Sequence, residues 1–318
     1  MISNVSARDR ILLYLIALPA AANYIGVVLR TYLFPIIANV SNWWAPALVY
    51  AMGGTSSVRF KDGTSFALSR SNMSEFIARV ETMNPPRMPE GFSMSKHGGA
   101  ILIKARDKRI LSDKESATAI VAEFYSGDHS LIDVKGRDVV DIGAYVGDSA
   151  LYYLIGAGAR NVYAFEPVAS LAKLAERNGR LNKLGKRLTV YNAAVSGSAS
   201  ASRGATISDG FSGKGDRAST IRLSDVVRRH GLSGAALKVD CEGCEYGIFR
   251  SLPGEVLSKF DVVHVEYHYG YRDIEERLRA EGYEVRHTMP KVGFSNMFRK
   301  TLVTGDIVAV RRKSAKRH

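Results

Sequence analysis

The chain has 318 residues, of which 46% are hydrophobic and 24% charged, so it can bury a core and is not wholly disordered. Lysine and arginine number 44 against 31 aspartates and glutamates. The resulting charge of +13 favours an anionic partner, such as nucleic acid or an acidic lipid surface, without choosing between them. Two cysteines, Cys241 and Cys244, are too few for a disulfide framework and predict a reducing, intracellular setting.

The N-terminus carries two apolar stretches. Residues 11–29 contain no charged side chain and could just span a bilayer, but Pro19 and Asn23 interrupt the run. Residues 32–52 are also interrupted by prolines and asparagines. We expect residues 1–54 to form apolar helices, and three arrangements remain open: helices buried by internal or oligomer packing, an anchor in the membrane interface, or a spanning pair. The expected location is cytoplasmic, with membrane association through residues 11–29 and 32–52 as the alternative.

A second N-terminal region is expected over residues 55–125. Two alternating runs around Asp62-Gly63, within residues 57–68, predict a β-hairpin. The sequence NPPRMP at 84–89 predicts an extended break. Residues 100–104 and 108–112 predict a further pair of strands before a helix over 113–124.

Residues 126–311 show short apolar, β-branched runs that alternate with helical stretches. This pattern predicts an α/β fold, a Rossmann-like, doubly wound and mostly parallel seven-stranded sheet. The predicted strands are 138–143, 161–166, 188–193, 235–240, 261–267, 282–288 and 305–311. The predicted helices are 148–157, 168–183, 223–231, 244–252 and 271–281. Residues 196–220, rich in serine and glycine, form either a substrate loop or two short strands, and residues 312–318 form a basic tail.

The first strand of this domain ends in a glycine turn, DIGAYVG at 141–147. Its glycines allow the backbone to approach a ligand closely. The G-x-x-x-G spacing differs from the G-x-G-x-x-G fingerprint of pyrophosphate-binding turns. A sulfonium cofactor has no phosphates, and the carboxylate of Asp141 suits its positively charged amino acid moiety.

The next two strands also end in residues suited to a nucleoside. Glu166 lies 23 residues after Gly143, where a carboxylate can accept hydrogen bonds from both ribose hydroxyls. The alternative is an acid that stabilises the start of the following helix. The third strand ends in Asn192-Ala193-Ala194, whose small side chains leave room for an adenine ring.

These pieces occur together in one order, and the chain resembles the FkbM-type methyltransferases, a class I family that uses S-adenosylmethionine. The segments that carry the resemblance are 139–144, 164–167, 192–196, 237–245 and 266–268, and they span half of the chain. The resemblance implies S-adenosylmethionine as the cofactor and an oxygen acceptor. With the residue-level reasoning above, it predicts these cofactor-binding residues: Asp141, Gly143, Ala144, Gly147, Asp148, Glu166, Pro167, Asn192, Ala193 and Asp240.

The chemistry is expected at the ends of the fourth and fifth strands. Asp240, Glu242 and Glu245 surround the end of the fourth strand, where carboxylates can bind a cation or accept a proton. Because side chains alternate along a strand, His264, Glu266 and His268 share one face of the fifth. We predict Glu242, His268 and Glu245 as catalytic residues, with Glu242 or His268 as the base. For Glu245, a structural role in the first turn of a helix is the alternative.

A zinc site is a weaker hypothesis for the same region. Cys241-x-x-Cys244 followed by His264 and His268 imitates a zinc constellation, but the intervening gap exceeds that of a zinc finger. The sheet pattern already explains both histidines, so no metal is assigned. A redox pair of the two cysteines lacks a thioredoxin-like context.

The sequence thus predicts an O-methyltransferase whose acceptor is a hydroxyl of a sugar, a glycan or another small or lipid-linked metabolite. Two alternatives remain: an RNA methyltransferase, favoured by the charge of +13, and a non-catalytic binding or scaffold protein of the same fold. Nucleic acid is a less favoured partner than a small-molecule or glycan acceptor. The oligomeric state stays open.

Overall fold

The structure is a computed structural model that describes residues 4–6, 8–9, 33–73, 76, 80, 90–113, 117–126, 128–197, 205–208, 215–295 and 300–312. The chain divides into two compact units: Tyr14–Pro89, and Met1–Leu13 together with Glu90–His318. This division differs from the boundary expected at residue 125, because Arg109 and Leu111 are hydrogen-bonded to the methyltransferase-like part of the chain. The expected segment 11–29 and residues 313–318 of the tail lie outside the described residues.

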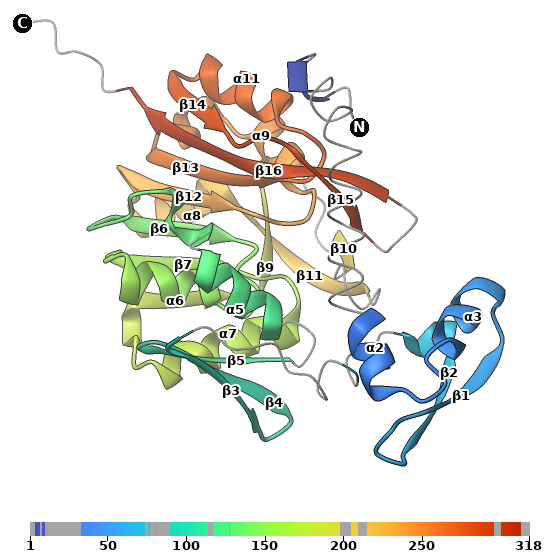
Figure 1. The fold of residues 1–318 in the computed structure, drawn as a ribbon. Helices are drawn as coiled ribbons and strands as arrows, with labels where there is room; N and C mark the ends of the chain where they lie inside the picture. Colours follow the sequence, from blue (N-terminus) through green and yellow to red (C-terminus); the bar gives the residue numbers. More distant parts are fainter. Residues whose placement is uncertain are drawn as a thin grey trace, which may run out of the picture. The chain divides into compact units, whose positions relative to one another are not determined.

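One large sheet runs through the larger unit (Figure 1). Its strands lie in the order β14-β16-β13-β12-β6-β7-β8, and β15 pairs with the first part of β16. The strands from β8 to β13 are parallel to their neighbours, whereas β16 is antiparallel to both β13 and β14. The strands are β6 (Asp138–Ile142), β7 (Asn161–Phe165), β8 (Leu188–Tyr191), β12 (Ala235–Val239), β13 (Phe260–Tyr267), β14 (Tyr283–His287), β15 (Lys291–Ser295) and β16 (Lys300–Arg311). The seven predicted strands are confirmed, and β15 is an addition.

Helices connect the parallel strands. The chain runs from β6 outward to β7 and β8, then returns to β12 on the other side of β6 and runs outward to β13. The strand order therefore reverses between β6 and β12, and ligands of doubly wound sheets bind at the carboxyl ends of the strands at such a point. The helices are α6 (Asp148–Leu151) with the π-helical turn η5 (Tyr152–Gly156), α7 (Ala169–Leu181), η6 (Gly185–Arg187), α8 (Leu223–His230), α9 (Glu245–Ser251), α10 (Gly254–Leu257) and α11 (Arg272–Ala280).

The two central strands are buried along their whole length. β6 reads DVVDI and β12 reads AALKV, and every residue of both is buried. Apolar residues on both faces are expected for a parallel sheet covered by helices on each side. Each strand nevertheless carries one charged residue near its carboxyl end, and the register places Asp141 opposite Lys238. A buried charge needs a partner, so this pair marks the region of the site.

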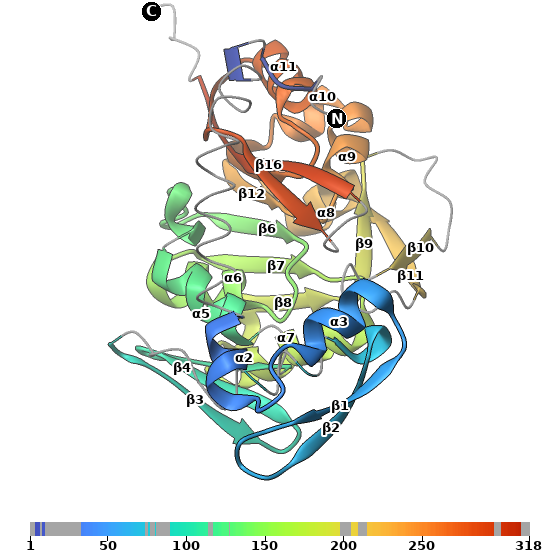
Figure 2. The ribbon, with the colours of Figure 1, turned by 45° about the vertical axis from the view of Figure 1, so that its right-hand side comes forward.

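Smaller sheets flank the large one in the same unit. β9 (Ala193–Ser196) begins just beyond the carboxyl end of β8 and pairs with β11 (Gly215–Arg222), which pairs with β10 (Ala205–Ser208) (Figure 2). In the described part of 196–220, the hypothesis of short strands is thus confirmed. The predicted pair over 100–112 is also confirmed as β4 (Ala100–Ala105) and β5 (Lys108–Ser112), and β3 (Phe92–His97) is an unpredicted third strand. α5 (Ala117–Ser126) and η4 (Asp128–Leu131) follow.

The smaller unit contains the predicted hairpin, formed by β1 (Thr55–Arg59) and β2 (Ser65–Ser69) and followed by η3 (Arg70–Asn72). The second apolar stretch forms two short helices, α2 (Phe34–Asn39) and α3 (Ala45–Met52). Between them, the buried Asn42 hydrogen-bonds the carbonyl of Ser57 and the N–H of Arg59, which holds this segment against β1. None of the helices described is both long enough and apolar enough to cross a membrane.

Candidate active site

The glycine turn after β6 is fitted closely against the end of β12. A Cβ atom on Gly143 would lie 1.6 Å from the carbonyl oxygen of Asp240, and the residue has φ of +79°. The N–H groups of Gly143 and Ala144 both donate to the carbonyl of Phe165 at 3.0 Å. Gly147 has φ of +81° and packs against Ala175 of α7. The turn thus joins β6, β7 and the end of β12 into one rigid surface.

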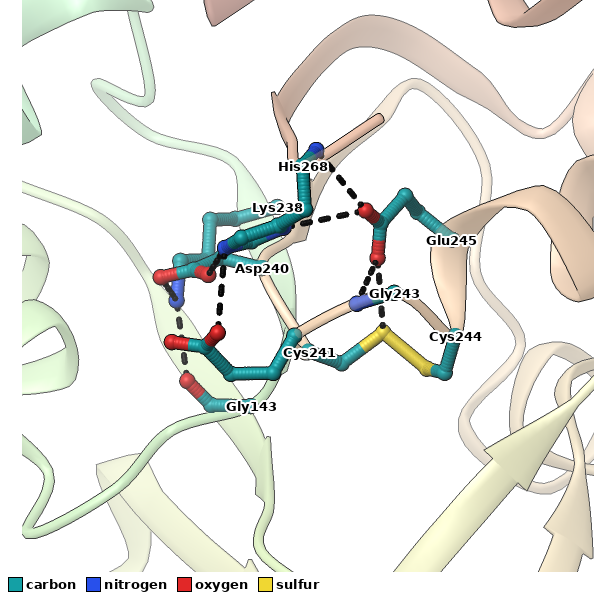
Figure 3. The surroundings of a disulfide bond; sticks show 9 residues. Gly143, Lys238, Asp240, Cys241, Gly243, Cys244, Glu245 and His268 are labelled. Carbon is teal, nitrogen blue, oxygen red and sulfur yellow. Dashed lines mark hydrogen bonds and ion pairs between the residues drawn. A yellow bond between two sulfur atoms is a disulfide. The ribbon is translucent and has the colours of Figure 1, made fainter. Parts of the chain in front are cut away.

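A buried lysine links the acids of the two central strands. Lys238 Nζ lies 3.5 Å from Asp141 Oδ1. It also lies 3.3 Å from Asp240 Oδ2 and donates to the carbonyl of Gly143 at 2.9 Å (Figure 3). Burial acts to lower the pKa of Lys238, but Asp240 and Asp141 overcome it and raise the pKa well above its ordinary value. The sequence prediction gave Lys238 no role. Its signals were a lysine inside an otherwise apolar strand and its place in segment 237–245, which carries the family resemblance.

Asp141 keeps one oxygen without a hydrogen bond. Its Oδ2 accepts from the hydroxyl of Ser149 at 2.6 Å, whereas Oδ1, fully buried, has no hydrogen-bond partner among the described residues. Such an atom is costly to leave unsatisfied, by about 1–3 kcal/mol. Asp141 is therefore able to accept a hydrogen bond from a ligand at this end of β6.

Glu166 lies at the end of β7 as predicted, but its carboxylate already has backbone partners. Oε1 accepts from the N–H of Val168 at 2.8 Å and Oε2 from the N–H of Tyr145 at 3.0 Å. Burial raises the pKa of Glu166 to about 7, although these two hydrogen bonds act to lower it. Each carboxylate oxygen can accept a further hydrogen bond, so the two backbone donors orient the group and leave it able to bind hydroxyls.

Three further predicted cofactor residues surround Glu166. The side-chain amide of Asn192 donates to the carbonyls of Glu166 and Pro167, at 3.0 and 2.9 Å, and Asn192 itself is exposed. Its amide nitrogen thus fastens the ends of β7 and β8 together. Ala193 is buried at the start of β9. The structure places Pro167, Asn192 and Ala193 at one edge, but assigns the Asn192 nitrogen a structural role.

Asp148 lies in a different group from the other predicted cofactor residues. It opens α6 directly after Gly147, and its Oδ2 lies 3.3 Å from Nε2 of His129. Glu123 completes the group, and burial together with the charge of Asp148 raises the pKa of Glu123 to about 9. Neither His129 nor Glu123 was predicted. Both precede the first strand of the methyltransferase-like pattern, in a segment without a recognisable motif.

The ends of β12 and β13 bring together the predicted catalytic residues (Figure 3). Glu245 is fully buried; its Oε1 accepts from the backbone N–H of His268 at 3.2 Å and faces His268 Nδ1 at 3.0 Å. Its Oε2 accepts from the N–H of Gly243 at 2.9 Å. A carboxylate held by three donors has little capacity left for a substrate. Glu245 is thus positioned to orient His268, with Nδ1 as the donor.

The other ring nitrogen of His268 faces acidic side chains. Nε2 lies 3.4 Å from Glu242 Oε2 and 4.0 Å from Asp240 Oδ1. Burial opposes protonation of His268, but the hydrogen bond to Glu245 and the charges of Glu245, Glu242 and Asp240 raise its pKa to about 9. His264, four residues earlier on β13, is buried and its Nε2 lies 2.9 Å from Asp306 Oδ1, so it is a hydrogen-bonded core residue.

Glu242 is the exposed member of the group, with 68% of its side chain accessible. Loss of hydration raises its pKa, as do the charges of Asp240 and Glu245, whereas His268 lowers it. Its exposure lets solvent weaken each of these effects. The backbone of Glu242 has φ of +57°, which is unfavourable for a residue with a Cβ, so the loop holds this side chain in a defined place.

The two cysteines form a disulfide in this loop, which corrects the expectation of reduced thiols. Glu242 and Gly243 both have positive φ, so the chain turns back on itself and the Cα atoms of Cys241 and Cys244 come within 5.4 Å. That separation is typical of a disulfide. The bonded sulfurs offer no thiolate to zinc, and Cys241 Sγ instead contacts Glu245 Oε2 at 3.6 Å.

The residues at this edge fit a cationic nucleoside cofactor. The turn requires glycine at 143 and 147, and Glu166 is oriented at the end of β7. One buried oxygen of Asp141 faces Lys238 but has no hydrogen bond among the described residues. Carboxylates outnumber the cations Lys238 and His268, which suits a sulfonium and an ammonium group. The strand order and these strand ends define a class I, S-adenosylmethionine-dependent methyltransferase.

The comparison with protein families identifies the kind of methyltransferase. Residues 141–294 match the model of the methyltransferase FkbM domain. This part of the chain is thus an FkbM methyltransferase domain that uses S-adenosylmethionine, and the predicted resemblance, fold and cofactor are confirmed. No curated protein matches the sequence.

Solved structures show more distant similarity. Methyltransferase FkbM from Methylobacillus flagellatus KT is 12% identical over 62% of this chain and 54% of its own, with a TM-score of 0.39. The tRNA m1G37 methyltransferase of M. jannaschii is 12% identical over 84% of this chain and 78% of its own, with a TM-score of 0.41. TYW2 of M. jannaschii, crystallised with AdoMet, is 16% identical over 70% and 88%, with a TM-score of 0.37. The family assignment rests on the match over 141–294.

Proposed function

We propose that this protein transfers a methyl group to a hydroxyl of a sugar, a glycan or another small or lipid-linked metabolite. The observation that carries the proposal is the pair formed by Glu245 and His268. Glu245 holds Nδ1 of His268, and Nε2 faces Glu242 and Asp240 at the ends of β12 and β13. A hydroxyl placed there can release its proton to the imidazole. S-adenosylmethionine would supply a sulfonium-bound methyl group, to whose carbon the hydroxyl oxygen would bond in line as S-adenosylhomocysteine leaves.

The charge of the site supports a neutral, polyhydroxylated acceptor. Asp240 and Glu242 are both accessible in part and can accept hydrogen bonds from neighbouring hydroxyls. A phosphate group would be repelled by the same carboxylates. We therefore assign to Glu242 the binding of the acceptor, to His268 the role of base and to Glu245 the positioning of His268.

Cofactor binding is tested first, by isothermal titration of the intact protein with S-adenosylmethionine and S-adenosylhomocysteine. The acceptor is then sought by measuring S-adenosylhomocysteine release with free sugars, oligosaccharides and lipid-linked saccharides. Failure of a folded sample to bind either form of the cofactor would refute the proposal.

The pH profile then tests the assignment of the base. His268 with a pKa of about 9 is protonated at neutral pH and cannot accept a proton, so kcat/KM should rise with pH until about 9. Glu245→Gln removes a charge that raises this pKa and should move the rise to lower pH. His268→Gln should lower the rate by about 10²–10⁴-fold and abolish the rise. A profile that is flat above pH 6 and unchanged in His268→Gln would instead favour Glu242 as the base.

RNA is the second candidate acceptor, because the chain carries a charge of +13. An RNA methyltransferase would show binding whose logarithm falls steeply with the logarithm of salt concentration, since each phosphate contact releases counterions. A gel shift with structured RNA at 50 and 200 mM salt separates the two candidates. Binding of a neutral saccharide should have no such slope.

A further inference from the structure

A second group of ionisable side chains comes from the segments that precede and follow β6 in the sequence. The proposed methyl transfer does not use this group. Glu123 comes from α5, His129 from η4 and Asp148 from the start of α6. α5 and α6 lie side by side in both views (Figures 1 and 2). One atom of each residue, a carboxylate oxygen or an imidazole nitrogen, lies within 4.8 Å of the other two.

The imidazole of His129 is buried and points into this group. Only 8% of His129 is exposed, and the rings of Phe124, Tyr152 and Tyr153 pack around it at 5.5, 5.6 and 6.4 Å. Its Nε2 lies 3.3 Å from Asp148 Oδ2 and 3.8 Å from Glu123 Oε2, but the atom is shielded from solvent and makes no hydrogen bond with the described residues. A polar atom in this position is costly unless it binds something.

The remaining two residues complete a set of metal donors. Asp148 is 5% exposed, so its carboxylate is fixed at the base of the group. The side chain of Glu123 is 44% exposed, which leaves one side open for an ion to enter and keep water ligands. When both carboxyl groups are ionised they repel each other, and a cation between them removes that repulsion.

We propose that Glu123, His129 and Asp148 bind one divalent transition-metal ion. Carboxylate oxygens with one imidazole nitrogen suit Mn²⁺ or Zn²⁺, whose ligands lie about 2.0–2.2 Å from the ion, so donor atoms within 4.8 Å of one another can reach it with small side-chain adjustments. The ion joins α5 and η4 to the residue that follows Gly147. It thereby fastens the segment before β6 to the cofactor turn.

The test uses the full chain after treatment with EDTA and dialysis. Mn²⁺ is titrated into the protein and the free ion is measured by electron paramagnetic resonance, with Zn²⁺ followed in parallel by calorimetry. We expect one ion per chain, and at least a tenfold loss of affinity in His129→Gln and in Asp148→Asn. Asp240→Asn is the matched control, because Asp240, Glu242 and His268 form the other group with convergent donors among the described residues. This control should bind as the wild type does.

Each other outcome overturns the proposal. Absence of binding would mean that the three residues form only an internal ion pair. Binding that is lost in Asp240→Asn and kept in His129→Gln would place the ion at the other group. If His129→Gln and Asp148→Asn, which change buried residues, fail to fold, Glu123→Gln provides the test instead. Its side chain is partly exposed, and the rise in Tm that Mn²⁺ causes in the wild type should disappear in this variant.

Discussion

Gly143 shows how much of the site depends on single atoms. The sequence suggested that glycine at this position admits a ligand, and the structure shows that the backbone of Asp240 occupies the place of a Cβ atom. The carbonyl of Gly143 also accepts from Lys238, so one residue connects β6, β12 and the buried lysine. The close approach that this glycine allows is thus made by the backbone of Asp240, before any ligand is considered.

Gly143→Ala should disrupt this contact, because the new Cβ would lie 1.6 Å from the Asp240 oxygen and positive φ is unfavourable for alanine. We expect the unfolding free energy to fall by more than about 3 kcal/mol and cofactor binding to be lost. Gly282→Ala is the control, with φ of +84° and no atom within 4 Å, and should cost about 1 kcal/mol. Urea denaturation followed by circular dichroism measures both. Equal decreases in the unfolding free energy of the two variants would show that the backbone near Asp240 moves away from the new Cβ atom at little cost.

At the scale of elements, α7 holds β5 in the larger unit. Asn178 is fully buried in α7, and its side chain pairs with both the N–H and the carbonyl of Leu111, at 2.7 and 2.9 Å, and donates to Val146 at 2.8 Å. One turn later Asn182 pairs in the same way with Arg109 near the surface. These bonds explain why the chain divides before residue 90 and not near 125. No sequence periodicity indicates them.

Asn178→Ala should destabilise the protein by about 3 kcal/mol or more, because three buried backbone groups lose their partners. Asn182→Ala removes an equivalent pair where water can replace it and should cost about 0.5–1.5 kcal/mol. Thermal and urea unfolding of both variants give the comparison. If Asn178→Ala and Asn182→Ala lowered the unfolding free energy by similar amounts, burial would not explain the importance of the Asn178 hydrogen bonds.

At the scale of the whole molecule, folding raises the proton affinity of several groups. Burial raises the pKa of Glu166 to about 7 and, with the charge of Asp240, that of Glu266 to about 8. Burial opposes the shift of His268, but its acidic neighbours raise its pKa to about 9. Unfolding returns the pKa values of Glu166 and Glu266 to about 4.5 and that of His268 to about 6.5. The folded state thus binds more protons than the unfolded state between about pH 5 and 9.

The stability contributed by each group is complete below its unfolded pKa and is lost as pH rises through its folded pKa. The unfolding free energy should therefore fall between pH 6 and 9, on the order of 1 kcal/mol per pH unit, in the absence of cofactor. Scanning calorimetry at 0.15 M salt tests this trend, and His268→Gln should flatten its upper part. A Tm that rises over this range would contradict it.

The site was only partly predictable from the sequence. Strand ends that meet at one edge of a parallel sheet brought Asp141, Glu166, Asp240 and Glu242 to the same region, as their positions after apolar runs predicted. The partners of each acid were not predictable, because they depend on register and side-chain packing. Lys238 pairs with Asp141 across two strands, and Glu245 turns toward His268 from the next connection.

Taken alone, the sequence determined the doubly wound fold, the seven strands of its main sheet and the cofactor class, because strand-length apolar runs and strand-end residues are local features. The tertiary structure decided the features that depend on the exact backbone conformation or on contacts between distant segments. These are the saturated carboxylate of Glu245, the disulfide in the Glu242 loop, the separate group around His129, and the attachment of β5 to α7. Burial, charge pairing and the close approach of particular atoms set these interactions, and all three arise only when the chain has folded.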